Sequence, residues 1–333
     1  FEKVGYVNFT DSLKRFLLVD GDILFSHINS LPMVGNAAIY RSDNPLLHGM
    51  NLLRIRPASS AVSNWILYWL KSKGVREDVE SRAKPAINQA SISTGSVRAL
   101  PALIPTLFEQ TQIARFLDHE TAKIDALIRE QARLIKLLHE KRQAVISHAV
   151  TKGLDPYVPM KDSEVEWLGE VPAHWDVSRL KFATSLIIDC PHETPNYDPE
   201  GEFLVIRTAD IHEGLLKPTS MYRLKKQDFV HRTRRAALRK LDIVYGREGE
   251  RWGHAALVPE NGMFCLGQRM MQFRVNDEFD AHFLMYQLNS TSVYRQGDLD
   301  TVGATSPHVN VSTIRNYDIS CPPKGEQVVI GEY

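Results

Sequence analysis

The clearest hydrophobic pattern lies in the middle of the chain. Residues 107 to 152 contain no glycine and no proline, and their apolar residues recur three or four positions apart between Arg, Lys, Glu and Gln, which is the period of one helix face. Thr106 and Glu109 form a T-x-x-E capping box at the start, and Gly153 and Pro156 end the pattern. We therefore expect one uninterrupted helix, about 65 to 70 Å long at a rise of 1.5 Å per residue.

The apolar stripe of this helix needs a partner. A long core helix is one interpretation, but a helix several times the ordinary length extends beyond one compact domain. The 3-4 spacing favours one half of a coiled coil or helical hairpin that acts as a spacer. The positions expected to pack there are Ile113, Leu117, Ile124, Leu127, Ile128, Leu134, Ile135, Leu138 and Val145.

The sequence on either side of this helix is an internal repeat. Five segments recur with an offset that stays within 217 to 220 residues, so one unit occurs twice. Each unit is a mixed module followed by a long helix. The matching segments are 21–25 and 241–245, 35–38 and 253–256, 51–56 and 269–274, 67–72 and 285–290, and 108–113 and 325–330.

Both modules have the pattern of α+β domains. Short runs rich in Ile, Val, Leu, Phe and Tyr predict strands, and two longer amphipathic runs predict helices over 63–72 and 280–290. The strands are expected at 22–25, 50–55, 203–206, 242–245 and 269–275.

The repeat also gives domain boundaries. We expect a first domain over 1–105, the helix over 106–153, a second domain over 154–323 and the start of a second long helix over 324–333. Residue 1 aligns near residue 220, whereas the second module begins near residue 165. The chain is therefore expected to be a fragment that lacks about fifty residues at the front and most of the second helix at the back.

Composition is that of an ordinary soluble globular protein. Of the 333 residues, 43% are hydrophobic and 24% charged, which excludes a disordered or collagen-like chain. No run approaches the ~18 apolar residues of a membrane span. The three cysteines, Cys190, Cys265 and Cys321, are widely spaced and never form CxxC. We therefore expect neither a disulfide scaffold nor a zinc ribbon, and we expect a cytoplasmic location.

No motif for catalysis or metal binding is present. The chain has no GxxxxGK[ST] loop, no strand-linked GxGxxG and no HExxH. Asn44-Pro45-Leu46 lacks the second proline and the aromatic residue of an amino-methyltransferase motif. Cys190 and His192 could give two metal ligands, but no second pair lies nearby, which favours a buried cysteine beside a surface histidine. We predict neither a catalytic residue nor a metal site.

Charge is zero in total and uneven along the chain. Residues 155 to 222 hold 13 Asp/Glu and 5 Lys/Arg, whereas residues 223 to 274 hold 12 Lys/Arg and 5 Asp/Glu. The basic part contains RLKKQDFVHRTRRAALRK, residues 223 to 240, in which cations could follow a phosphate backbone. The alternatives are a solvated basic face and an arginine tied to Asp242, and charge alone does not decide between them. The candidate nucleic-acid contacts here are Arg232, Arg234, Arg235, Arg239, Arg247, Arg251 and Arg269.

The first module has a weaker set of candidate contacts. Lys14, Arg15 and Arg54 are its cations in the matching region, and Asn29 is a residue type that pairs with adenine. In the second module Gln268 is of the same type. As isolated residues, both are more often structural than base-reading.

The long helix and its flank carry a family resemblance. Residues 108 to 182, from FEQTQIARFLDHE to HWDVSRLKF, closely resemble the central region of the DNA sequence-specificity subunit of type I restriction-modification systems. The flanking modules resemble the two target-recognition domains of that family. In the second module the resemblance lies in Leu241-Asp242-Ile243-Val244-Tyr245, the glycine-bearing residues 246–253 and Leu266-Gly267-Gln268-Arg269.

The resemblance implies a fold and partners. In that family each recognition domain reads one half of a bipartite double-stranded DNA site, and two long helices pack antiparallel as a spacer. The subunit is not catalytic and binds no cofactor. It docks two modification subunits, which use S-adenosylmethionine to methylate adenine, and restriction subunits that use ATP and Mg²⁺ join them. This chain is thus expected to be two α/β recognition domains joined by half of a coiled coil.

Two other interpretations remain open from the sequence. The chain could be the recognition part of a single-chain restriction-modification enzyme whose methylase and nuclease lie elsewhere in the polypeptide. It could also be a partial specificity subunit that acts as a decoy, although two nonidentical modules argue for a full subunit.

Overall fold

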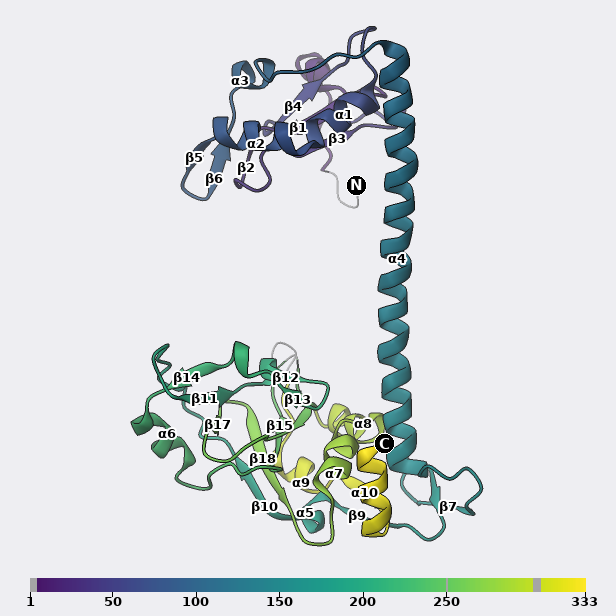
Figure 1. Ribbon diagram of the computed structural model, residues 1–333, viewed down its shortest axis with the longest axis vertical. Coiled ribbons are helices and arrows are strands. Elements are labelled where there is room, and N and C mark those ends of the chain that lie inside the picture. Colours follow the sequence, from purple (N-terminus) through teal and green to yellow (C-terminus); the bar gives the residue numbers. More distant parts are fainter. Residues whose placement is uncertain (1–4, 250, 302–306) are drawn as a thin grey trace. The chain divides into compact units, whose positions relative to one another are not determined.

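Two compact units make up the computed structural model, which describes residues 5–249, 251–301 and 307–333 (Figure 1). The first unit ends at residue 133 and the second begins at residue 134, inside one long helix. Each unit is a mixed α/β module together with one end of that helix. We call residues 5–105 module one and residues 154–323 module two. The expected fold class is confirmed, whereas the exact domain boundaries stay a prediction.

The long helix, α4, spans Leu107–Lys152, as the apolar period predicts. Its capping box is formed: the Thr106 N–H donates to the Glu109 carboxylate at 2.9 Å, and the Glu109 N–H donates to Thr106 Oγ1 at 3.3 Å. Gly153 ends the helix with a φ of +75°, a conformation that glycine adopts without strain.

Module one holds a three-stranded antiparallel sheet in the order β3-β1-β4 and a smaller sheet in the order β2-β6-β5. Helices α1 and α2 cover the first sheet, and Ile23, Phe25, Leu70 and Val79 lie in the core between them. The elements are η1 (Asp11–Phe16), β1 (Ile23–Ser26), β2 (Ile28–Asn29), β3 (Ala37–Ile39), β4 (Leu52–Ile55), α1 (Ser63–Lys71), α2 (Lys73–Arg82), β5 (Lys84–Ala86), β6 (Gln89–Ser91) and α3 (Thr94–Arg98).

Module two repeats this plan and extends it. Its sheets run in the orders β10-β18-β15-β16, β14-β11-β17, β19-β9, β12-β13 and β7-β8. Its helices are α5 (Leu180–Ala183), α6 (Lys226–Thr233), α7 (Ala281–Leu288), α8 (Thr291–Leu299) and α9 (Val311–Arg315), with η2 at Thr208–Asp210 and η3 at Pro218–Ser220, and α10 (Lys324–Glu332) follows the module.

The strands of module two are mostly short. They are β7 (Met160–Asp162), β8 (Glu170–Pro172), β9 (Asp176–Arg179), β10 (Thr184–Asp189), β11 (Phe203–Ile206), β12 (Ile211–His212), β13 (Leu215–Leu216), β14 (Tyr222–Leu224), β15 (Ile243–Gly246), β16 (Ala255–Leu257), β17 (Phe264–Leu266), β18 (Met270–Val275) and β19 (Asp318–Cys321). Every strand and helix that the sequence predicts is present within two residues of its expected bounds.

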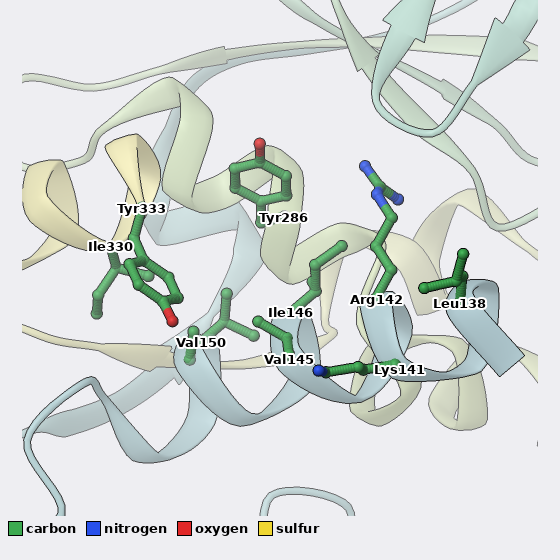
Figure 2. Close-up of a pocket in the computed structure, with 10 residues that line it drawn as sticks. Leu138, Lys141, Arg142, Val145, Ile146, Val150, Tyr286, Ile330 and Tyr333 are labelled. Atoms are coloured by element: carbon green, nitrogen blue, oxygen red, sulfur yellow. The ribbon is translucent and has the colours of Figure 1, made fainter.

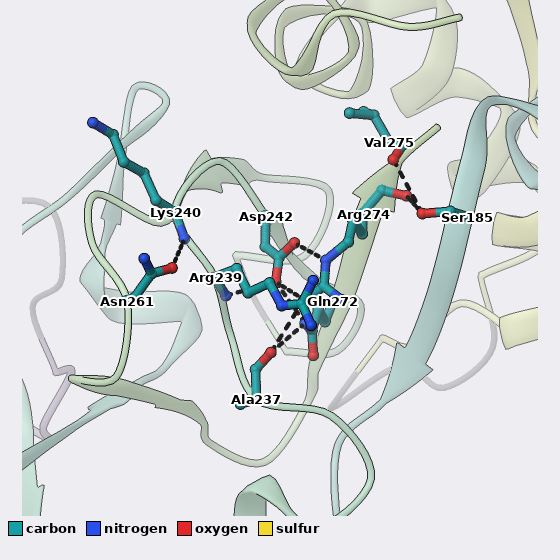
Figure 3. A network of polar contacts seen from close by, with 9 residues as sticks. All are labelled: Ser185, Ala237, Arg239, Lys240, Asp242, Asn261, Gln272, Arg274 and Val275. Carbon is teal, nitrogen blue, oxygen red and sulfur yellow. Dashed lines mark hydrogen bonds and ion pairs between the residues drawn. The ribbon is translucent and has the colours of Figure 1, made fainter. Parts of the chain in front are cut away.

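The internal repeat is visible in a buried ion pair at the entrance of the central strand of each module. In module two the Asp242 carboxylate accepts hydrogen bonds from Arg274 Nε and Nη2 at 2.7 Å each, from Gln272 at 2.7 Å and from the Arg239 N–H at 2.8 Å (Figure 3). Asp242 is 1% exposed. This pairing explains why part of the basic sequence in this region is structural.

Module one has the same arrangement. The Asp22 carboxylate accepts two hydrogen bonds from Arg56 at 2.7 Å and one from the Val19 N–H at 2.9 Å. Burial by itself raises the Asp22 pKa, but the hydrogen bonds from Arg56 and Val19 outweigh it and hold that pKa below its usual value. Both modules therefore fix the loop that enters their central strand with one buried carboxylate.

A second repeated contact ties each long helix to its module. Gln110, on the first turn of α4, donates to the Ser60 and Pro105 carbonyls and accepts from the Val62 N–H at 2.9 Å. On α10, Gln327 likewise donates to the Glu278 and Pro322 carbonyls and accepts from the Asp280 N–H at 2.8 Å. Both glutamines are almost fully buried, so each helix begins at a fixed place on its module.

We expect Asp242→Ala to lower the free energy of unfolding of module two by about 3 kcal/mol, because it leaves Arg274 and Gln272 without a buried acceptor. Asp22→Ala should cost less, since the Arg56 side chain is 48% exposed and water can replace its partner. Urea titration followed by tryptophan fluorescence measures both. Glu260→Ala, at an exposed position, serves as the control and should change stability by under about 0.5 kcal/mol. Equal losses for Asp242 and Asp22 would contradict this account of burial.

Candidate nucleic-acid interface

Four exposed cations of module two lie in the loop that follows α6. Helix α6 ends at Thr233, and the chain then runs through Arg234, Arg235, Arg239 and Lys240 before it enters β15. All four side chains are exposed. Within the part of the chain that the structure describes, none of them forms an ion pair. This loop therefore presents four uncompensated positive charges to solvent.

Arg232 does not belong to this surface, which corrects its prediction as a nucleic-acid contact. It is 7% exposed, because its guanidinium points inward from the last turn of α6. There it donates to the carbonyls of Leu266 at 2.9 Å, Glu193 at 3.1 Å and Pro191 at 3.4 Å. Arg232 thus joins α6 to the end of β17 and to the loop after β10.

Arg247 is also structural, and its prediction as a nucleic-acid contact is wrong for the same reason. Only 7% of it is exposed. Its guanidinium donates to Asp189 at 2.9 Å and to the Val309 carbonyl at 3.4 Å, and it lies 2.8 Å from a Glu248 oxygen. Two carboxylates compensate its charge, so Arg247 ties β10, β15 and the chain around residue 309 together.

Arg251 and Arg269 differ from these two because both are exposed. Arg251 donates to the carbonyls of Ala209 and Ile211 at 3.4 and 3.2 Å, which uses part of its donor set. The Arg269 side chain is 52% exposed, and its Nε lies 3.8 Å from Glu248. Its backbone has a φ of +70°, which is uncommon outside glycine.

The strand register places the predicted cations at two ends of one strand pair. At one end of the pair, Gly246, the last residue of β15, lies opposite Met270, the first residue of β18. Arg247 follows Gly246, and Arg269 precedes Met270, so both arginines lie at this end. Ile243 pairs with Phe273 about 10 Å away along the strands, next to Arg239. The sequence-predicted cations therefore do not form one cluster.

The candidate cations of module one are largely committed to local contacts. Lys14 forms an ion pair with Asp11 at 2.9 Å, and the Arg15 guanidinium lies 4.8 Å from the centre of the Phe16 ring. Arg54 donates to the Leu17 carbonyl at 2.7 Å. Only Lys14 and Arg15, on η1, remain exposed enough to meet a ligand.

Asn29 and Gln268 hold different positions in their modules. The Asn29 amide donates to Ser26 Oγ at 3.2 Å and accepts from the Ser30 N–H at 2.8 Å, so both ends of that amide are used locally. Gln268 donates to Thr194 Oγ1 at 3.1 Å, and among the described residues its amide oxygen accepts no hydrogen bond. Of the two adenine-type residues, Gln268 is the one with capacity left for a ligand.

Cys190 and His192 have different surroundings. Burial raises the pKa of the Cys190 thiol, and the negative charge of Asp189 adds to that effect, which keeps the sulfur protonated. His192 lies on the surface with Nε2 3.0 Å from Asp189. Among the described residues, no group of three or more His, Cys, Asp or Glu side chains is placed to hold a metal ion.

The apolar stripe of α4 is uncovered along its middle. Ile124, Leu127 and Ile128 are 56 to 61% exposed, and Leu134, Ile135 and Leu138 are also exposed. At the end of the helix, a pocket of about 370 Å³ opens between α4, α7 and α10 (Figure 2). Its apolar walls include Leu138 and Val145 of the predicted stripe together with Tyr286 and Ile330.

A second apolar groove lies at the other end of the stripe. Ile113 and Leu117 line it with Trp65 and Trp69 of α1, which are stacked with ring centres 6.5 Å apart. The groove holds about 740 Å³. The predicted stripe thus runs between two apolar hollows, each within its own unit.

Comparison with known proteins identifies the family. A sequence model for the type I restriction modification DNA specificity domain matches residues 189–333. A putative type I restriction enzyme specificity subunit, MjaX, from Methanocaldococcus jannaschii is 34% identical over 340 residues, which cover 99% of this chain and 75% of that protein. The chain belongs to the specificity subunits of type I restriction-modification systems. Its role is that of a DNA sequence-specificity subunit, and the family is not catalytic.

Other specificity subunits are more distant. The EcoKI specificity subunit of Escherichia coli is 26% identical over 140 residues, which cover 41% of this chain and 30% of that protein. A chain from a type I restriction-modification system superposes with a TM-score of 0.70 at 18% identity over 95% of this chain and 74% of its own. The HsdS subunit from Thermoanaerobacter tengcongensis gives 0.50 at 17% identity over 95% and 73%. These structures agree on the fold.

The helices of this specificity subunit can be compared with the requirements of a membrane span. In the ranges 5–249, 251–301 and 307–333, no helix has both the length and the apolar character needed to cross a bilayer. Helix α4 is long enough, but its charged residues exclude it.

Removing the Arg232 side chain should destabilise module two of this specificity subunit. Arg232→Ala leaves one buried and two partly buried backbone carbonyls without their donor, which should lower the thermal midpoint and cost about 2 to 4 kcal/mol. Arg235→Ala removes an exposed arginine from the same stretch and should stay within about 0.5 kcal/mol of the parent. Differential scanning calorimetry measures both. Equal stability of the two variants would mean that Arg232 is not structural.

Proposed function

We propose that this chain reads a bipartite double-stranded DNA site, with one half-site for each module. The observation that carries the proposal is the repeat itself: a specificity subunit holds one scaffold twice, with different exposed side chains on each copy. Two readers with different surfaces suit a site whose halves differ in sequence. In module two, the contacts would come from Arg234, Arg235, Arg239, Arg251 and Arg269, and in module one from Lys14 and Arg15.

The charge distribution supports this proposal. Exposed lysines and arginines displace condensed counterions from DNA, which gives affinity that falls as salt concentration rises. Arg234, Arg235, Arg239 and Lys240 have no carboxylate partner among the described residues, so their charge is available to phosphates. A contact of this kind positions the protein but carries no sequence information, so base readout would come from other residues near the loop.

The long helix would set the distance between the half-sites. We propose that α4 packs antiparallel against a second long helix that begins as α10 does, because both helices start with the same buried glutamine contact. The exposed stripe of Ile124, Leu127 and Leu134 would be the packing face. A helix of 46 residues is about 70 Å long, and its rigidity would keep the spacer constant.

The catalytic work would lie in partner subunits. We propose that two modification subunits dock on this chain and methylate adenine with S-adenosylmethionine, and that restriction subunits using ATP and Mg²⁺ join the complex in the cytoplasm. This chain would bind none of these cofactors. Support comes from the relative named a type I restriction enzyme specificity subunit and from the superposable chain of a type I system.

Coexpression with the neighbouring modification gene in a methylation-free host tests the proposed function. Methyladenine mapping by sequencing should reveal one asymmetric motif in two parts with a fixed gap. A genome that stays unmodified, or a motif in a single block, would refute the bipartite assignment.

Replacing Arg234, Arg235 and Arg239 together with alanine should weaken DNA binding by the assembled complex. The slope of log affinity against log salt should fall by up to about 3 in magnitude, since up to three phosphate contacts are lost. Fluorescence anisotropy between 50 and 200 mM salt measures the slope. Substitution of Lys161, Lys181 and Lys217 with alanine, which removes the same charge elsewhere in module two, serves as the control. An identical slope for the parent and the triple arginine variant would contradict the assignment.

Charges in the apolar stripe should prevent the helix from pairing. We expect Leu127→Glu with Leu134→Glu to abolish assembly with the modification subunits, because two carboxylates would be buried in an apolar seam. Analytical ultracentrifugation of the mixed subunits reports assembly. Lys136→Glu, on the opposite side of the same helix, is the matched control and should assemble normally. Assembly of the double variant would show that the stripe has no partner in the complex.

A further inference from the structure

One turn of module two has the properties of a base-reading element. The turn Gly267-Gln268-Arg269 joins β17 to β18, and its backbone is held at three points. The Gly267 N–H donates to the Ile206 carbonyl at 2.8 Å, Arg232 donates to the Leu266 carbonyl at 2.9 Å, and the Arg247 N–H donates to the Arg269 carbonyl at 2.9 Å. Glycine is required at 267, because a Cβ there would lie 2.7 Å from the Ile206 carbonyl oxygen.

The side chains of this turn project from the rigid backbone with donor groups available. Arg269 is 52% exposed, and its recorded ion pair is a 3.8 Å approach of Nε to Glu248. Glu248 is itself paired with the buried Arg247 at 2.8 Å, so the carboxylate that faces Arg269 is fixed. Within the ranges that the structure describes, the terminal N–H groups of Arg269 have no hydrogen-bond partner, and the φ of +70° shows that the backbone holds this residue in an uncommon conformation.

Module one has a turn at the matching place with different side chains, although only Arg269 of the two final residues has a positive φ. Gly49, Met50 and Asn51 lie 218 residues before Gly267, Gln268 and Arg269, directly before β4 as the second turn lies before β18. The backbone contact is repeated too, since the His27 N–H donates to the Asn51 carbonyl at 3.2 Å. Met50 is 80% exposed. The shared position and backbone hydrogen bond therefore present Met-Asn in one module and Gln-Arg in the other.

We propose that this turn determines base specificity, and that Arg269 reads a guanine in the half-site of module two. The inference rests on the proposed function. A guanidinium can donate two parallel hydrogen bonds to guanine O6 and N7 in the major groove, a pairing that a phosphate contact does not provide. Gln268 reads the adjoining base, and Asn51, whose amide matches adenine N6 and N7, holds the equivalent place in module one.

Arg232 lies between this turn and the loop of residues 234–240, which we propose contacts phosphates. Arg232, in the last turn of α6, donates to the Leu266 carbonyl, and Arg234 and Arg235 follow just after the end of the helix. The buried Arg232 therefore connects the loop of residues 234–240, which carries the exposed positive charges, to the turn of residues 267–269. Phosphate contact through the loop would place the turn at a defined position on the DNA.

Selection from a pool of random duplexes by the assembled complex tests the assignment. Arg269→Asn is the informative variant, since asparagine tolerates the left-handed backbone but lacks the guanidinium fork. It should reduce preference for one guanine in one half-site by about five- to a hundredfold and leave the other half-site unchanged. Arg235→Asn is the matched control, and it should lower affinity for all duplexes alike without changing any base preference.

The reciprocal substitution gives a second measurement. Asn51→Arg should shift preference toward guanine at one position of the other half-site only. If Arg269→Asn instead behaves like Arg235→Asn, or if the preference that it loses is not for guanine, the assignment of Arg269 is wrong. A parent complex that selects no bipartite sequence would refute the proposed function itself, whereas a parent that selects one while Arg269→Asn keeps every base preference would refute this inference alone.

Discussion

The buried glutamine at the start of each long helix is the contact on which the rest of the arrangement depends. Gln110 and Gln327 each satisfy one backbone N–H and two carbonyls of the module that their helix leaves. A shift of the helix by one residue would bury an amide and three backbone groups without partners, at a cost of several kcal/mol. Each of the two helices therefore leaves its own module at one place, and the proposed spacer of fixed length needs that constraint in both modules.

Much of the fold could be predicted from the sequence, because the signals were local or repeated. The capping box, the absence of Gly and Pro and the 3-4 apolar spacing are properties of 46 consecutive residues, and the repeat gave the strands twice. Gln110 and Gln327 also lie in a matched segment of the repeat. Their role could not be read, because the groups they satisfy include Val62 and Asp280, which lie 48 and 47 residues away in the chain.

The candidate site was harder to predict, since charge along a sequence does not reveal exposure. Arg232 lies in the same basic run as Arg234 and Arg235, yet it faces three backbone carbonyls inside the module. Arg247 is compensated by Asp189, 58 residues earlier. Buried arginines of this kind hold the loops from which the exposed arginines project. The number of positive residues in 223 to 240 is therefore larger than the charge available to a ligand.

The repeat separates what the scaffold needs from what a reader needs. Two buried polar anchors are the same in both modules: Asp22 and Asp242 each hold an arginine, and Gln110 and Gln327 each hold a helix. Positions on the exposed turn differ, with Met50 and Asn51 in one module and Gln268 and Arg269 in the other. Exchanging exposed residues on a backbone fixed by buried contacts changes the surface at little cost in stability. A protein that carries the scaffold twice can therefore present two unlike surfaces without two unlike folds.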